Sequence, residues 1–264
     1  MKMDFNMILE LDRKMLLDFY SLGAWVHQYT ATALYHEAQR IANDTRVALD
    51  DRPRIQMVLR VKILVEVVSA METLGRFCFS IRNREKDGIA TCYINMRDNK
   101  ANEFYNLYKL GNPILPEILY LPEIKDMEEI VDNGDLQLES MNELINRIAV
   151  AYLDDQGEDF MNRKLKRTYN AIKHGSHIIN NIKELVPIPA DFVIGEVPIV
   201  TRWPYRNEAI NNKTMIFTTR SMSEEAVLED LKLIGEISIV LSTLSQLIIL
   251  LIDKGLLSYG NKVI

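Results

Sequence analysis

The apolar residues of this chain recur at intervals of three and four over long stretches, the spacing that places them on one face of an α-helix. The stretch 15–41 carries a single apolar stripe, whereas 55–82 is apolar around most of its circumference, which predicts a central helix. The stretch 221–255 repeats the pattern. Its most apolar part, 237–252, contains several hydroxyl side chains and is shorter than the roughly 20 residues of a membrane span. We therefore predict a mainly α-helical bundle that ends in a core helix with one exposed edge.

Length and composition favour a single helical domain covering 1–264. A chain of 264 residues with 48% hydrophobic and 26% charged side chains can bury its own core and is unlike a disordered protein. The two cysteines, Cys78 and Cys92, do not form a disulfide framework, which favours a reducing compartment. The first residues contain an early acid and no uninterrupted apolar run, so we expect no signal peptide and a cytoplasmic protein.

Shorter helical patterns lie between the long ones. They cover 122–133, 138–153 and 158–174, and Asp98 is placed to cap a further short helix. Residues 90–96 are predicted as a short extended piece. Ser221 with Glu224 three residues later forms a capping-box pattern, which predicts that the last helix begins there.

A change in amino-acid composition after residue 183 predicts a small β-insertion. The segments 191–203 and 213–220 are rich in β-branched and aromatic residues and are predicted to form an antiparallel hairpin near 188–220. Its tip, Arg202-Trp203-Pro204-Tyr205-Arg206, fits a loop anchored by its aromatic rings. It also fits a platform on which single-stranded bases stack.

The net charge of −6 hides a local basic segment. Residues 117–159 contain thirteen acids and two bases, whereas 160–183 contain six bases and no acid. Phosphate neutralisation dominates nucleic-acid affinity, so an acidic chain is a poor general binder of nucleic acid. A basic stripe is nevertheless sufficient to hold one phosphate or a short strand.

On a helix over 160–178, a set of polar side chains falls within about 60° of one another, opposite an apolar stripe. The polar set is Arg163, Arg167, Asn170 and His174. Guanidinium groups bind phosphate bidentately, and imidazole moves a proton near neutral pH. The structural alternative is that Lys173, His174 and Gly175 form an ordinary helix C-terminus, with cations at the negative dipole end and a glycine cap.

The segment from Arg167 to His174 resembles the signature of the HEPN superfamily, in which Arg is followed by four to six residues and then His. Glu72-Thr-Leu-Gly75 upstream is similar to the layout of that family, and the resemblance covers 55–82, 138–175 and 221–255. It implies a homodimer that brings two motifs together and, in active members, a metal-independent endoribonuclease acting on RNA.

The resemblance implies that His174 is the general acid or base and that Arg167 stabilises the negative charge of the phosphorane transition state. Arg163, Asn170 and Lys173 are the expected substrate-binding residues. Active members usually carry Asn, Asp or His directly after the Arg, and this chain has Thr168 there. The alternative function is therefore a non-catalytic, dimeric binding or assembly module.

The sequence offers no other catalytic pattern. None of the four histidines has a Glu three residues earlier, as a di-metal carboxylate bundle requires, and no Gly-rich phosphate loop or paired Cys motif occurs. We expect no metal, no cofactor and no membrane partner.

Overall fold

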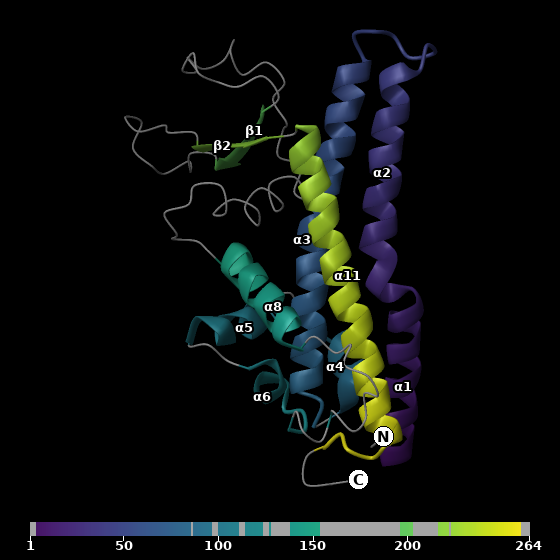
Figure 1. The fold of residues 1–264 in the computed structure, drawn as a ribbon, viewed down its shortest axis with the longest axis vertical. Coiled ribbons are helices and arrows are strands. Elements are labelled where there is room, and N and C mark those ends of the chain that lie inside the picture. Colours follow the sequence, from purple (N-terminus) through teal and green to yellow (C-terminus); the bar gives the residue numbers. More distant parts are fainter. Residues whose placement is uncertain are drawn as a thin grey trace. The chain divides into compact units, whose positions relative to one another are not determined.

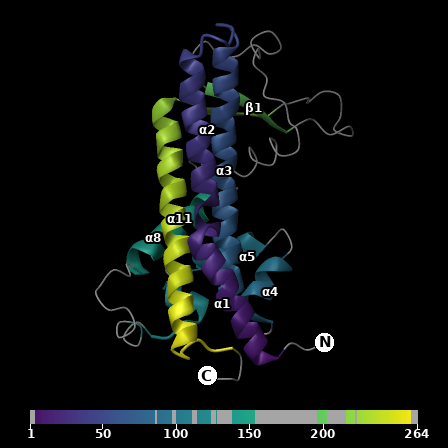
Figure 2. The same cartoon turned by 90° about the vertical axis from the view of Figure 1, so that its right-hand side faces the viewer.

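The computed structural model describes residues 4–85, 87–96, 100–110, 114–123, 127, 138–153, 196–202, 216–221 and 223–259. Most of these residues are helical, so the prediction of a mainly α-helical protein is confirmed. Two of the long helices, over 52–82 and 224–253, lie where the apolar repeat predicts them (Figures 1 and 2).

The described elements are, in chain order, α1 (Phe5–Ser21), the 3₁₀ turn η1 (Gly23–Trp25), α2 (Val26–Asn43), α3 (Arg52–Arg82), α4 (Gly88–Ile94), α5 (Lys100–Asn106), the 3₁₀ turn η2 (Leu107–Leu110), α6 (Leu115–Leu119), α8 (Leu138–Leu153), β1 (Glu196–Arg202), β2 (Ile216–Ser221) and α11 (Glu224–Asp253). The chain divides into two compact units. The first contains Met1–Tyr29, Ser69–Leu153 and Ile234–Ile264, and the second contains Thr30–Val68 and Asp154–Leu233. The single-domain assignment stays a prediction.

In the first unit, α4 lies against α1 and α5 lies against α8 (Figures 1 and 2). The core is formed by apolar residues of α3, α5, α8 and α11, among them Leu74, Phe77, Phe104, Ile145, Leu241 and Leu244. The Phe19 and Phe77 rings stack at 4.7 Å, which joins α1 to α3.

In the first unit, buried polar groups bind Ser258 and Tyr259, which follow α11. The Asp12 carboxylate accepts hydrogen bonds from the backbone N–H groups of Ile89 (2.8 Å) and Ala90 (2.7 Å) and from the Tyr259 hydroxyl (2.8 Å). The Arg84 guanidinium donates to four backbone carbonyls: Ile81 in α3, Leu119 at the end of α6, Tyr120 directly after it, and Ser258 after α11. Both buried charged groups are therefore hydrogen-bonded, as their burial requires.

The second unit contains the remaining parts of α2, α3 and α11 with the two strands. The Gln56 amide donates to the Ala38 carbonyl at 3.0 Å and joins α3 to α2. At the start of α11, the Glu224 carboxylate accepts hydrogen bonds from Tyr35 and Gln39, both at 2.6 Å. Acidic groups are favourable at a helix N-terminus because they face its positive dipole end.

Strands β1 and β2 pair antiparallel, with Glu196 opposite Ser221 and Val200 opposite Phe217. The register shifts between Val200 and Arg202. The residues between the strands lie outside the described part of the chain, so the hairpin insertion as a whole stays a prediction.

The structure differs from the prediction in two places. The helix expected over 15–41 is broken near Leu22, whose φ of −136° departs from helical values. A Cβ at the neighbouring Gly23 would lie 3.0 Å from the Phe19 ring, so the chain passes close to that ring at the break. The prediction of an extended segment over 90–96 is wrong. Residues 88–94 form the helix α4, and the N–H groups of Ile89 and Ala90 in its first turn donate to Asp12.

The interior of α11 agrees with the prediction of a core helix with an exposed edge. Val240, Leu241 and Ile248 are buried, whereas Leu228 and Ile239 are 47% and 57% exposed. Among the described helices, α11 is the one long and apolar enough to cross a membrane, and 56% of its most apolar window is buried inside the protein. Core helices of soluble proteins have the same composition, so this property alone does not indicate a membrane span.

Candidate functional site

The polar set predicted to carry chemistry lies outside the described residues. This holds for Arg163, Arg167, Asn170, Lys173 and His174. It also holds for Thr168 and for the predicted hairpin tip, except for Arg202 at the end of β1. The candidate site within the described residues is therefore built from other side chains.

The segment from Glu72 to Gly75, which the HEPN resemblance includes, has packing roles in α3. The Glu72 carboxylate accepts a hydrogen bond from the Tyr152 hydroxyl of α8 at 3.1 Å. A Cβ at Gly75 would lie 2.8 Å from the Tyr105 ring and 2.9 Å from Ala101 Cβ, so the missing side chain lets α5 approach α3. The segment thus holds α3, α5 and α8 together, and the Glu72 carboxylate has a hydrogen-bond partner within the first unit.

Histidines in the described part of the chain have structural partners. His27 Nε2 lies 3.0 Å from Thr73 Oγ1, and the His36 ring contacts Tyr35. The described residues contain no group of three His, Cys, Asp or Glu side chains arranged to hold a metal ion. Cys78 and Cys92 are free thiols, and burial raises the pKa of both above the usual value for cysteine.

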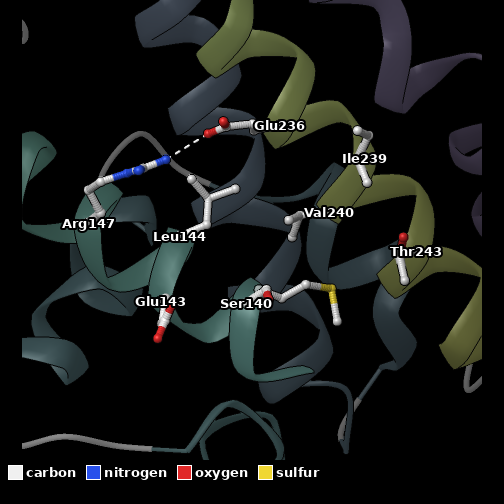
Figure 3. A pocket seen from close by; sticks show the side chains of 9 residues that line it. Ser140, Glu143, Leu144, Arg147, Glu236, Ile239, Val240 and Thr243 are labelled. Atoms are coloured by element: carbon white, nitrogen blue, oxygen red, sulfur yellow. Dashed lines mark hydrogen bonds and ion pairs between the residues drawn. The ribbon is translucent and has the colours of Figure 1, made fainter. Parts of the chain in front are cut away.

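A groove of about 700 Å³ lies between α8 and α11 within the first unit. Its walls are nine residues: Ser140, Met141, Glu143, Leu144 and Arg147 from α8, and Glu236, Ile239, Val240 and Thr243 from α11. Figure 3 shows these side chains lining the space between the two helices. The volume falls within the range of about 300–1,000 Å³ typical of ligand sites.

The groove has an apolar floor and a charged rim. Met141, Leu144 and Val240 are buried along the floor, whereas Ile239 is largely exposed. Arg147 reaches across from α8 and donates to the Glu236 carboxylate of α11 at 2.7 Å, as Figure 3 shows. The side chains of Arg147 and Glu236 are 66% and 32% exposed, so this ion pair contributes about 0–1 kcal/mol to stability.

No pattern in the sequence predicts this groove. Four of its residues on each helix follow the spacing i, i+3, i+4 and i+7, the same spacing that indicates a core-facing stripe. Charged residues within the stripes are the local signal that they reach solvent, namely Glu143 and Arg147 on α8 and Glu236 on α11. The pairing of α8 with α11 is non-local, and no local pattern predicts it.

Comparison with known proteins gives no relative from which a function could be transferred. No protein-family model, no curated protein and no solved structure matches the chain.

Proposed function

We propose that the protein acts on RNA as a HEPN-like, metal-independent endoribonuclease. Arg167 would bind the scissile phosphate and stabilise its negative charge in the transition state. His174 would transfer the proton of the attacking 2′-hydroxyl or of the leaving 5′-oxygen. Arg163, Asn170 and Lys173 would hold the flanking phosphates and bases. The reaction requires no cofactor.

The observation that carries the proposal is the spacing of Arg167 and His174 in a segment with six bases and no acid. Seven positions along a helix correspond to about two turns, so the two side chains would share one face. The helices α3, α8 and α11 meet the helical requirement of the resemblance, a condition that many other helical proteins also meet.

The proposal includes a homodimer, because the resemblance joins two Arg/His motifs across an interface. It also includes a hairpin insertion near 188–220 and a cytoplasmic location, where RNA is abundant and cysteines stay reduced. Sedimentation at micromolar concentration tests the dimer. A species of 30.5 kDa would remove the shared-site mechanism.

The test of catalysis is cleavage of single-stranded RNA by the purified full chain in the presence of a chelator. We expect products with a 2′,3′-cyclic phosphate, because an imidazole without a metal acts most simply on the substrate's own hydroxyl. Removing a positioned acid or base typically costs about 10²–10⁴ in rate, so His174→Ala should abolish measurable cleavage.

Lys166→Ala is the matched control, since it removes a base from the same segment outside the proposed motif. It should retain most activity. Cleavage that survives both His174→Ala and Arg167→Ala would refute the assignment of these residues.

The alternative is a non-catalytic binding or assembly module with the same helical fold. Thr168 favours it, because active members usually carry a more polar side chain at that position. The absence of cleavage under every condition, with the fold intact, would support this function. His174→Ala would then cost only the helix-dipole interaction, about 0.3–1 kcal/mol of stability.

A further inference from the structure

The lining of the groove between α8 and α11 extends over two turns of each helix. On each helix its lining residues span i to i+7, for example Ser140 to Arg147 on α8 and Glu236 to Thr243 on α11. Eight helical residues cover about 10 Å, or two turns. A partner helix presents its own i, i+3 or i+4, and i+7 side chains over the same length.

The exposed apolar surface lies where such a partner would make contact. Ile239 is 57% exposed on the rim, directly beside a floor formed by Met141, Leu144 and Val240. All four side chains line the same groove, Met141 and Leu144 from α8 and Ile239 and Val240 from α11. Covering Ile239 and filling the space above the floor would remove apolar area from water, which favours association.

The charge of the rim distinguishes between partners. Arg147 and Glu236 neutralise each other, whereas Glu143 is exposed and has no ion-pair or hydrogen-bond partner among the described residues. Glu139, one turn before Glu143 on α8, is a second exposed acid next to the groove lining. The unneutralised charge of the rim is therefore negative.

We propose that this groove binds one amphipathic helix of a partner protein, with an apolar stripe on its floor and a Lys or Arg beside Glu143. The proposal does not depend on the Arg167/His174 chemistry. A basic flank on the partner would increase the association rate and fix its direction along the groove.

The test uses the full chain and a fluorescent 18-residue peptide with leucines at three- and four-residue spacing and flanking lysines. A peptide of the same composition, shuffled so that its leucines do not share a face, is the peptide control. Fluorescence anisotropy should show micromolar binding of the patterned peptide and at least tenfold weaker binding of the shuffled one.

The protein variants are Ile239→Glu and Glu143→Lys, both at exposed positions. Each should weaken binding of the patterned peptide about tenfold or more. Leu228→Glu makes the same kind of change on an exposed position of α11 outside the groove and should leave binding unchanged. Circular dichroism checks that each variant is folded.

Three outcomes would overturn the proposal. The first is an absence of binding, or equal binding of the two peptides. The second is unchanged binding by Ile239→Glu. The third is a dimer of the full chain that Ile239→Glu dissociates in sedimentation, since the groove would then be occupied by a second copy of this chain. RNA cleavage is measured separately, so failure of the groove proposal leaves the proposed catalysis untouched.

Discussion

Asp12 is a buried acid whose carboxylate joins three parts of the first unit. Its carboxylate belongs to α1, yet it binds the first N–H groups of α4 and the Tyr259 hydroxyl beyond α11. At Gly88, just before these N–H groups, φ is +83° and a Cβ would lie 2.5 Å from Ile8 and 2.9 Å from the Asp12 carboxylate. A glycine is therefore required at this position, where the chain both adopts a left-handed conformation and passes close to α1.

Replacing Asp12 with alanine should destabilise the protein by at least about 2 kcal/mol. The substitution leaves two buried backbone N–H groups and one hydroxyl without an acceptor, and each unsatisfied group costs about 1–3 kcal/mol. Chemical denaturation of wild type and Asp12→Ala measures the difference. A loss below about 0.5 kcal/mol would contradict the hydrogen bonds assigned to this carboxylate.

The same pair of proteins should show a pH-dependent difference. Burial raises the pKa of Asp12 above its ordinary value, an effect that the hydrogen bonds from Ala90, Ile89 and Tyr259 partly offset. The folded protein then holds this proton more tightly than the unfolded chain. The stabilising contribution is complete below the unfolded pKa, near 4, and is lost as pH rises through the folded pKa. We expect the advantage of wild type over Asp12→Ala to decrease as pH rises from 4, and an increase would contradict the assigned shift.

The two thiols should react with a thiol reagent at different rates. Cys78 is fully buried and Cys92 is partly exposed, and burial raises the pKa of both, which lowers the reactive thiolate fraction. We expect slow reaction of Cys92 and no measurable reaction of Cys78 in the native protein at pH 8. In denaturant both thiols should be titrated. Fewer than two would indicate a disulfide in place of the free cysteines.

Among the elements, the long helices could be predicted because each buries a stripe that repeats with the helical period. The predicted helix over 138–153 coincides with α8, and 55–82 lies within α3. The start of α4 could not be predicted, because Asp12, which caps it, lies 77 residues away from Ile89 in the chain. The groove escaped prediction for the same reason, since it depends on how α8 lies against α11.

The N-terminus of α11 provides a direct comparison of the predicted and observed caps. Ser221 was the expected capping residue, but it ends β2, and the Ala226 N–H group donates to the Ser223 hydroxyl at 3.2 Å. Ser223→Ala should therefore cost about 1 kcal/mol of stability, and Ser221→Ala should cost less. Thermal or chemical denaturation of the two variants decides between them. A larger loss of stability for Ser221→Ala would instead support the predicted capping box of Ser221 and Glu224.

For the whole molecule, three helices matter most because α2, α3 and α11 each contribute residues to both compact units. Helix formation is cooperative, so loss of structure in one part of a continuous helix removes support from the residues that follow. We predict that the two units unfold in a single transition, as a single domain would.

Hydrogen exchange with peptide-level resolution tests this coupling, with Asp12→Ala as the perturbation. Asp12 lies in the first unit, and Arg52–Val68 of α3 lies in the second. If the units unfold together, Asp12→Ala should accelerate exchange of the most protected amides in 52–68 by the factor that its global destabilisation predicts. A loss of 2 kcal/mol corresponds to about 30-fold, since 1.4 kcal/mol is tenfold in an equilibrium constant.

Ser223→Ala, in the second unit, is the reciprocal perturbation and should accelerate exchange around Phe77 by about fivefold. Exchange that changes in the perturbed unit alone would show two independently folding domains and would refute the single-domain prediction.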